Sequence, residues 1–256
     1  MEECELKPYS KRKIIRKHNG SFLETDDVLA TEKKLAIFLA GKELISLYCT
    51  PVMIVELIAG FFFSQGLLRE GISPDDIDID CGDEIRVDIV NTGVVPEKGV
   101  LIRHLGGIGM ETNREFEKVA DDFSVHASAF RTFFAEFQKK SELFRLTGCF
   151  HSAAVSDGES ILAFAEDVGR HNAVDKVIGY CILNKVPFTA KLLLVSCRIS
   201  SEIVAKCLRC RIPVLASVSA PTDLAADMAE KGGVTLVGFM RRDRMNIYTN
   251  FQRVAR

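Results

Sequence analysis

The stretch with the most chemically reactive side chains in this 256-residue chain runs from Glu166 to Lys176 and reads Glu-Asp-Val-Gly-Arg-His-Asn-Ala-Val-Asp-Lys. Apolar and small residues at 161–165 precede it and predict a short buried strand. From Val174 onward, apolar residues recur every three or four positions, which is typical of a helix with one apolar face. The polar side chains therefore fall on a strand-to-helix turn, where unsatisfied backbone N–H groups favour anions.

Two interpretations of this turn remain open. His171 and Asp175 are four residues apart, so both lie on one face of the first helical turns. One interpretation is a ligand site in a crevice at the strand ends. The other is a well-capped helix whose aspartates are solvated or paired with neighbouring basic side chains; the residues concerned are Asp167, Asp175, Arg170 and Lys176.

The C-terminal half favours the ligand site, because it repeats one pattern. Buried strands are predicted at 192–195, 213–216 and 234–237, with helices between them. This order predicts an α/β layer with largely parallel strands. The carboxyl ends of such strands share one edge of the sheet. That edge would collect four polar segments, 166–171, 196–198, 217–222 and 239–244.

Three arginines lie within four positions directly after the last of these strands, at Arg241, Arg242 and Arg244. Guanidinium groups bind phosphate oxygens in a bidentate manner, so this segment predicts an anion site. The helix starts at Ser200 and Thr222 would add N–H donors. The alternative is a surface cluster of arginines paired with nearby acids.

A carboxylate at the same edge could accept hydrogen bonds from the N1 and N2 groups of a guanine. The sequence does not select among the three candidates, Asp175, Asp223 and Asp243. No glycine-lysine phosphate loop of the Walker type is present, which disfavours ATP hydrolysis.

Composition limits the remaining possibilities. A formal net charge of −2 gives no global field to attract nucleic acid. The most apolar run, Val52 to Phe63, has twelve residues and falls short of the roughly 20 needed to cross a bilayer. The acidic start lacks the positive region of a signal peptide. Eight cysteines in a chain of this size indicate reduced thiols, most of them buried, and we expect a cytoplasmic protein.

Cys207 and Cys210 form a CxxC pair inside a predicted helix, with no second pair. Two buried helix thiols are therefore a better interpretation than a zinc site. The phenylalanines at 130, 133, 134, 137 and 144 form a stripe at helical spacing and predict core packing.

The N-terminal half predicts fewer functional residues. A strand hairpin is expected around Gly41, then an apolar helix from Pro51 to about Gln65, and then strands within 77–90. The basic stretch 7–18 predicts a solvated edge strand or tail, with a phosphate-binding arm as the less favoured alternative. The glycine cluster 105–109 predicts a linker, because it is a weak phosphate signal.

Several segments together resemble the formate dehydrogenase accessory protein family (FdhD/NarQ). The resemblance covers nearly the whole chain after about residue 28. It rests on the motifs Thr147–Ala154, Glu166–Lys176, Arg198–Glu202 with Lys206, Ala220–Ala225 and Gly238–Arg244 continuing to Tyr248, and on Thr50-Pro51 with the helix that follows.

The resemblance implies a cytoplasmic sulfurtransferase of molybdenum cofactor maturation. Family members accept sulfur as a persulfide from a cysteine desulfurase. They pass it to molybdenum (or tungsten) bound by two molybdopterin guanine dinucleotides, before insertion into formate dehydrogenase. A GDP-like nucleotide would mimic this ligand at the same site. The site residues implied or expected here are Phe239, Met240, Arg241, Arg242, Asp243, Arg244, Arg170, His171, Ser219 and Thr222.

The implied fold is cytidine-deaminase-like and usually dimeric, without the deaminase zinc. We expect a strand-rich α+β subdomain at 1–110, ending in the glycine-rich loop 105–109, and a three-layer α/β domain at 111–256.

The chain departs from the family in its sulfur-carrying loop, which reads Cys-Gly-x-Cys-Gly in the family. Here Leu105 and Ile108 stand at the two cysteine positions. A persulfide requires an accessible, activated thiolate, which neither side chain supplies. Either another thiol replaces them, with Cys149 beside His151 and Cys197 beside Arg198 as candidates, or the protein is a non-catalytic chaperone that binds and delivers the cofactor.

Overall fold

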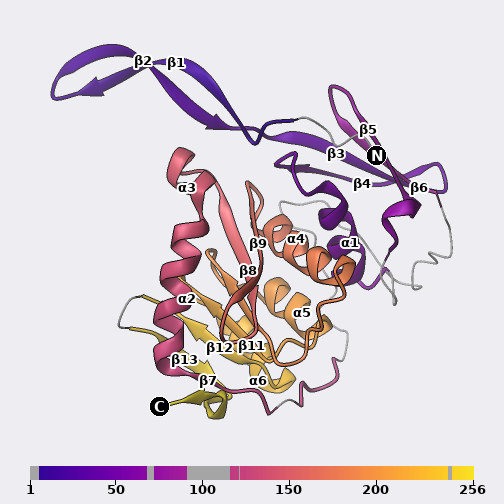
Figure 1. Cartoon of the computed structure of the whole chain (residues 1–256), viewed down its shortest axis with the longest axis vertical. Coiled ribbons are helices and arrows are strands. Elements are labelled where there is room, and N and C mark those ends of the chain that lie inside the picture. The colour runs from indigo at the N-terminus through magenta and orange to yellow at the C-terminus, as the bar shows by residue number, and fades with distance from the viewer. Residues whose placement is uncertain (1–5, 68–71, 91–115, 121, 242–243) are drawn as a thin grey trace.

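A computed structural model describes residues 6–67, 72–90, 116–120, 122–241 and 244–256. The glycine-rich loop Leu105–Gly109, Arg242 and Asp243 lie outside the described residues. The architecture is mixed α/β, as the sequence predicted, and is built around a six-stranded sheet with a smaller four-stranded sheet beside it (Figure 1).

The large sheet has the strand order β13-β12-β11-β10-β8-β9. β10, β11 and β12 are parallel to one another, as predicted, whereas β8 pairs antiparallel with β10 and β13 pairs antiparallel with β12. β9 is antiparallel to β8 and therefore runs in the same direction as β10. The bounds are β8 His151–Ser156, β9 Ile161–Asp167, β10 Leu192–Val195, β11 Val214–Ser217, β12 Thr235–Gly238 and β13 Asn246–Thr249.

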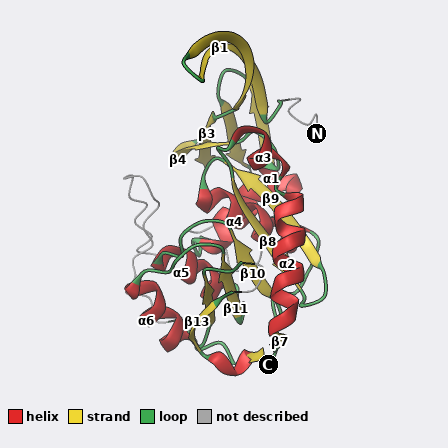
Figure 2. Ribbon diagram, turned by 90° about the vertical axis from the view of Figure 1, so that its left-hand side faces the viewer, coloured by secondary structure: helices red, strands yellow, loops and turns green. Residues whose placement is uncertain are grey.

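Helices cover both faces of this sheet and give a three-layer arrangement (Figure 2). One face packs against α4 (Arg170–Leu183), α5 (Ser201–Arg209) and α6 (Asp223–Gly232). The other face packs against α2 (Ala127–Lys140), which is followed by the short α3 (Glu142–Thr147). Short elements complete the C-terminal region: β7 Val125–His126, β14 Val254–Ala255 and the 3₁₀ helix Phe251–Arg253.

The predicted phenylalanine stripe is confirmed for α2, whose Phe130, Phe133, Phe134 and Phe137 are buried against the sheet. The prediction is wrong for Phe144. The chain breaks at Ser141 and begins α3, which turns the Phe144 side chain outward with 49% exposure.

The N-terminal sheet has the order β4-β3-β6-β5 and packs against α1. The predicted hairpin and the later strand pair are confirmed. The predicted helix is confirmed as well, but it begins three residues after Pro51. The bounds are β3 Lys33–Leu39, β4 Lys42–Cys49, α1 Ile54–Ser64, a 3₁₀ turn Pro74–Asp76, β5 Ile77–Cys81 and β6 Ile85–Ile89.

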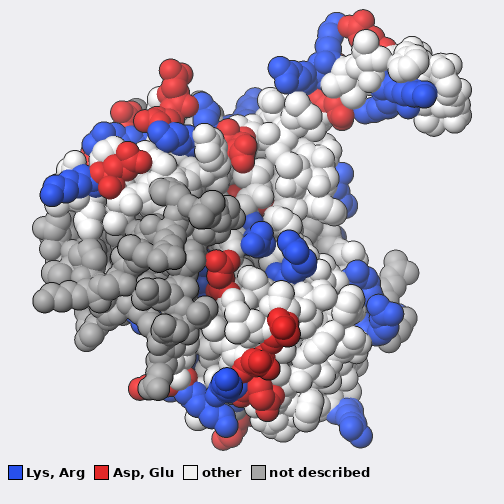
Figure 3. Space-filling model, turned by 180° about the vertical axis from the view of Figure 1, so that it is seen from behind, with Lys and Arg blue, Asp and Glu red and all other residues white. Residues whose placement is uncertain are grey.

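β1 (Tyr9–His18) and β2 (Ser21–Ala30) form a separate hairpin that projects from the rest of the molecule (Figure 1). β1 is almost entirely exposed, in agreement with the predicted solvated strand. Acidic side chains on β2 accompany the basic ones on β1 (Figure 3). Lys13 is paired with Glu24 at 3.6 Å. This mixture of charges disfavours the phosphate-binding arm.

The two parts of the molecule meet where α1 crosses α4. Gly60 and Gly179 face each other there, and their backbones are in contact. A Cβ atom at Gly179 would lie 1.8 Å from the carbonyl oxygen of Glu56, and one at Gly60 would lie 1.8 Å from that of Asp175. Only glycine permits this approach.

None of the helices in the described part of the chain is long and apolar enough to cross a membrane.

We predict that Gly179→Ala lowers the free energy of unfolding by about 3 kcal/mol, near the upper end for overpacking. The added methyl group forces the two helices apart, which outweighs the gain of about 1 kcal/mol in helix propensity. Urea unfolding measures the change.

Gly82→Ala provides the control. Gly82 lies in the β5–β6 turn, where an added Cβ is 3.8 Å from the nearest atom. Its stability should stay within about 0.5 kcal/mol of the parent. An unchanged midpoint and slope for Gly179→Ala would show that α1 and α4 are not in backbone contact.

Candidate functional site

The predicted edge exists, but it is long. β9, β10, β11 and β12 all end there, and β8 begins there, because His151 pairs with Asp167. However, β11, β10 and β8 separate β12 from β9. With about 4.8 Å between neighbouring strands, four steps place their ends about 19 Å apart. The polar segments at this edge therefore form separate groups.

The first group lines a cavity of about 340 Å³ at the end of β12. We call it the arginine cavity. Arg241, Arg244 and Met240 form one wall, and the start of α2 forms the other; the lining residues are Ala127, Ser128, Phe130, Arg131, Met240, Arg241, Arg244 and Met245.

A strained turn at Phe239 sets the direction of the Met240 and Arg241 side chains. Phe239 has φ of 52°, in the left-handed region that bulky residues rarely adopt. Its N–H donates to the Ser219 carbonyl at 2.9 Å, and the Met240 N–H donates to the Ser217 carbonyl at 3.0 Å. These bonds to the end of β11 hold the turn, which then buries Met240 and leaves Arg241 exposed.

The guanidinium of Arg241 is partly used to fix its own position. Its Nη1 donates to the carbonyl oxygens of Val218 and Met240, the latter at 2.9 Å. A guanidinium carries five N–H groups, so three remain for a ligand. Arg244 lies with its guanidinium carbon 5.8 Å from the centre of the Phe239 ring. Both cationic side chains thus border the same cavity.

The start of α2 adds positive potential that the apolar spacing of this helix does not predict. The first turn of a helix presents free N–H groups and the positive end of the macrodipole. His126 precedes α2, and its Nδ1 accepts the Ser128 N–H at 3.3 Å. Arg131 lies one turn further on and also lines the cavity. In the sequence, Arg131 could have been identified as a site residue by its position on the helix that carries the phenylalanine stripe.

Ser219 and Thr222 were also predicted to contact a ligand. The Thr222 hydroxyl accepts the Ala225 N–H at 3.2 Å and thereby caps α6, which confirms the predicted helix start. The Ser219 N–H donates to the Ser217 hydroxyl at 2.9 Å, and its carbonyl holds Phe239. Neither residue lines the arginine cavity.

A second group surrounds Arg170 and His171, at the start of α4. The Nε2 atom of His171 lies 3.0 Å from Oε2 of Glu202 on α5, and this contact lowers the pKa of the Glu202 carboxyl. Burial lowers the pKa of His151, and the positive charge of Arg170 lowers it further. The structure therefore brings Arg170 and His171 to α5 and β8, and does not place them in the arginine cavity.

The aspartates of the Glu166–Lys176 motif are structural. Asp167 and Lys176 are both fully buried, and the Lys176 Nζ lies 2.6 Å from the Asp167 carboxylate. Asp175 is 1% exposed and is paired with the buried Lys206 of α5. The predicted pairing is confirmed for Asp167 with Lys176, whereas Asp175 pairs with Lys206, outside the motif. The guanine-reading role considered for Asp175 is wrong, because its carboxylate is enclosed. Asp223 is exposed at the start of α6.

A second cavity, of about 520 Å³, lies where α2 ends and β8 begins. We call it the aromatic cavity, because Phe137, Phe144 and Phe150 line it. The remaining lining residues are Gln138, Ser141, Arg145, Gly148, Cys149, His151, Ser152, Ser196 and Val218.

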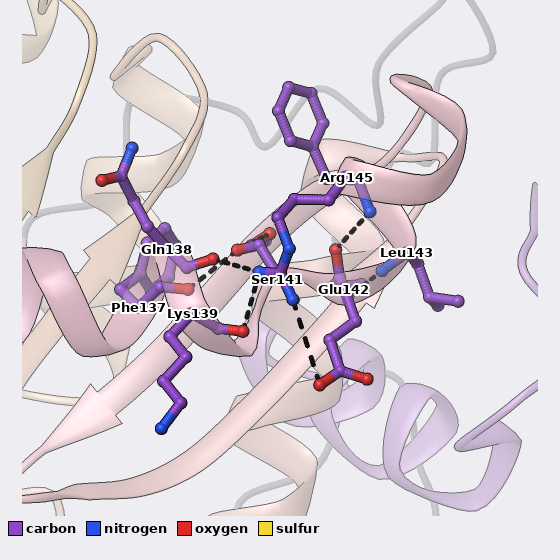
Figure 4. A network of polar contacts seen from close by, with 10 residues as sticks. Phe137, Gln138, Lys139, Ser141, Glu142, Leu143 and Arg145 are labelled. Carbon is purple, nitrogen blue, oxygen red and sulfur yellow. Dashed lines mark hydrogen bonds and ion pairs between the residues drawn. The ribbon is translucent and has the colours of Figure 1, made fainter.

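A polar network fixes the walls of the aromatic cavity (Figure 4). The buried carboxylate of Glu166 accepts the Leu143 and Phe144 N–H groups at 2.9 and 2.8 Å, so it caps the start of α3. Burial raises the pKa of Glu166, and these two hydrogen bonds oppose the rise. Arg145 reaches back to the carbonyl oxygens of Gln138 and Lys139, as Figure 4 shows. The turn between α2 and α3 is therefore well defined.

The structure separates the two candidate thiols. Cys149 is exposed and lines the aromatic cavity. Cys197 is 5% exposed, and burial raises its pKa to about 11. Burial also raises the pKa of the thiols of Cys49, Cys181, Cys207 and Cys210.

The predicted burial of Cys207 and Cys210 is confirmed. Cys81 is disulfide-bonded, so the expectation of reduced thiols does not hold for this residue. Within the described ranges, no cluster of histidine, cysteine or carboxylate side chains has the geometry of a metal site.

Known proteins share both sequence and fold with this chain. The model of the FdhD/NarQ family matches residues 30–255. The chain belongs to the FdhD/NarQ family. It is 35% identical over 253 residues to the sulfur carrier protein FdhD of Bacillus licheniformis, with 95% of this chain and 96% of the relative covered. It is 34% identical to FdhD of Sulfolobus acidocaldarius, with 95% and 98% covered.

A solved structure gives the same result for the fold. The crystal structure of a protein described as a formate dehydrogenase accessory protein, from Desulfotalea psychrophila, superposes with a TM-score of 0.76 at 26% identity. The match covers 97% of this chain and all of the other one. The FdhD/NarQ resemblance of the sequence motifs is thus confirmed over nearly the full length.

We predict that native-state alkylation with iodoacetamide at pH 7.5 modifies Cys149 well before any other free cysteine of the described residues. For Cys197, the rise in pKa from 9.0 to about 11 lowers the thiolate fraction by about 100-fold, and burial slows access further. Peptide mass spectrometry over a time course measures the order. Modification of Cys197 at a rate equal to that of Cys149 would contradict its burial.

Proposed function

We propose that this FdhD/NarQ family member is a maturation factor for a formate dehydrogenase. Its ligand in this proposal is the molybdenum or tungsten cofactor carried by two molybdopterin guanine dinucleotides, which is cargo and not a resident group. A diphosphate or guanine part of that ligand occupies the arginine cavity, and free GDP mimics it.

One observation carries the assignment of this cavity. Arg241 and Arg244 border the arginine cavity together with Arg131 and the positive end of α2. Exposed guanidinium groups near the positive end of a helix suit the oxygens of a diphosphate. Phe239 and Met240 contribute through their backbone N–H groups, which fix the turn that leaves Arg241 exposed.

The size of the cavity agrees with part of the ligand. Small-molecule sites have volumes of about 300–1,000 Å³, so a cavity of about 340 Å³ suits one nucleotide portion and not a pair of dinucleotides. The second dinucleotide requires further surface, which a second copy of the chain would supply in the homodimer that we propose.

Sulfur transfer is the second part of the proposal, with Cys149 as the acceptor. The Cys149 thiolate attacks the outer sulfur of a persulfide on a cysteine desulfurase. A new S–S bond forms on Cys149, the donor S–S bond breaks, and the donor leaves as a thiolate, so sulfur moves without net oxidation. The His151 imidazole, whose pKa is lowered, is neutral near pH 7 and can take up the thiol proton.

A second candidate function is a non-catalytic chaperone that binds and delivers the cofactor. The substitution of Leu105 and Ile108 for the two loop cysteines of the family favours it, because sulfur relay then depends on one relocated thiol. Both functions share the arginine cavity, a formate dehydrogenase client and a cytoplasmic location, and they differ only in sulfur loading.

We predict that Arg241→Ala with Arg244→Ala weakens GDP binding more than tenfold. Loss of one charged hydrogen bond costs about 1.5–3 kcal/mol, and about 1.4 kcal/mol corresponds to a factor of ten. Isothermal titration calorimetry of the full chain measures the affinity.

Arg12→Ala with Arg16→Ala is the matched control. It removes the same charge from the projecting hairpin, far along the sequence from the cavity, and GDP affinity should change less than twofold. Equal affinity of the parent and the Arg241/Arg244 variant would remove the assignment of the arginine cavity.

We predict that incubation with a cysteine desulfurase and cysteine adds the mass of one sulfur atom to the chain. Cys149→Ser should abolish the gain, whereas Cys197→Ser, a change at a buried thiol, should retain it. Intact-mass spectrometry, with reversal by dithiothreitol, measures the loading. No gain on the parent chain, together with preserved GDP binding, would favour the chaperone.

A further inference from the structure

We infer that the aromatic cavity and the arginine cavity are two subsites of one elongated ligand site. The aromatic cavity takes a planar, uncharged fused heteroaromatic ring, namely the pterin end of the dinucleotide. This inference rests on the proposed function and adds to it a location for the second end of the ligand.

Helix α2 connects the two cavities. Its first turns, including Phe130 and Arg131, line the arginine cavity, and its last turn, including Phe137 and Gln138, lines the aromatic cavity. Arg131 and Gln138 are seven residues apart, so they lie on the same face of the helix, about 10 Å from each other along its axis. The two cavities therefore lie near opposite ends of α2.

Val218, directly after β11, lines one cavity and is hydrogen-bonded to a residue that lines the other. It lines the aromatic cavity. The Val218 carbonyl oxygen accepts a hydrogen bond from Arg241, which lines the arginine cavity. A ligand with two ring systems joined by a diphosphate can thus have one end on each side of a single residue.

The aromatic cavity suits a planar ring. Phe137, Phe144 and Phe150 offer apolar faces, which favour stacked or edge-on rings. The cationic side chain in its wall, Arg145, is directed to the Gln138 and Lys139 carbonyls and lies 4.0 Å from the Glu142 carboxylate.

Hydrogen-bonding groups are also present in the wall, at Gln138, His151 and Ser196. A pterin carries both donors and acceptors on its edges, so it can use an amide, a neutral imidazole and a hydroxyl together. Cys149 belongs to the same wall. The proposed sulfur acceptor would then lie beside the pterin end of the ligand and away from the guanine end.

The test uses 6-hydroxymethylpterin, an uncharged fluorescent pterin, as a probe of the full chain. We expect the parent protein to bind it in a fluorescence titration, and saturating GDP to leave it bound, because the subsites are separate. Phe144→Ala should weaken pterin binding at least fivefold and leave GDP affinity unchanged. Since Phe144 is half exposed, its truncation should not unfold the chain.

Leu146→Ala is the matched control, because Leu146 lies on the same short helix, is exposed, and does not line the cavity. It should leave both affinities unchanged. Conversely, Arg241→Ala with Arg244→Ala should weaken GDP binding and leave the pterin bound.

Three results would overturn the inference: no pterin binding by the parent protein, displacement of the pterin by GDP, or equal pterin affinity in Phe144→Ala. GDP binding without pterin binding would remove this inference and leave the proposed function standing. Pterin binding without GDP binding would support the aromatic cavity and remove the arginine assignment.

Discussion

The buried crossing of α1 and α4 is the constraint on which the rest of this structure depends. Two glycines bring the helix backbones into contact, and two ion pairs are enclosed around the crossing. The Lys176 ammonium contacts both the Asp167 carboxylate and, at 3.0 Å, the Thr50 carbonyl oxygen, so it joins α4 to the segment before α1. Removing one partner of such a buried pair typically costs about 3–5 kcal/mol, because the other charge is left uncompensated.

The same crossing positions the edge of the large sheet. Asp167 ends β9, accepts the Thr50 N–H at 3.1 Å and the Gly169 N–H at 2.8 Å, and thereby sets the turn into α4. Asp175, one helical turn beyond His171, holds Lys206 of α5. The Asp175–Lys206 ion pair thus holds α4 against α5. This packing brings His171 and Glu202 into contact at the starts of the two helices. These side chains organise the sheet edge; the ligand subsites that we propose lie beside them, along α2.

Much of the local structure could be predicted from the sequence, because local patterns determine it. The strand at 161–165, the helix after it and the parallel strands β10 to β12 all follow apolar periodicity and short turns. The pairing of Asp175 could not be predicted in this way. Its partners, Ser64 and Lys206, are 111 and 31 residues away, and nothing in the local pattern identifies them.

The site shows the same limit. The arginine segment was predicted from its residues, and the structure places Arg241 and Arg244 at one cavity. The opposite wall was not predicted, because α2 was interpreted only through its buried phenylalanines. A helix has a second face, and on α2 that face carries Arg131 and Gln138, one at each cavity. Phe144 was assigned to the core because helical spacing continues across Ser141, although the chain turns there.

The contrast between buried and exposed cations supports the arginines as the anion-binding residues of the function that we propose. Lys176 and Lys206 are enclosed with one carboxylate each, so their charge is compensated within the core and unavailable to a ligand. Arg241 and Arg244 are exposed, and Arg241 spends only part of its hydrogen-bonding capacity on backbone carbonyls. A lysine ammonium that donated two hydrogen bonds to backbone carbonyls would have one of its three N–H groups left. The guanidinium of Arg241 retains three of its five N–H groups after donating two. A single arginine can therefore hold the end of β11 and bind an anion at the same time, and this double use links the two cavities.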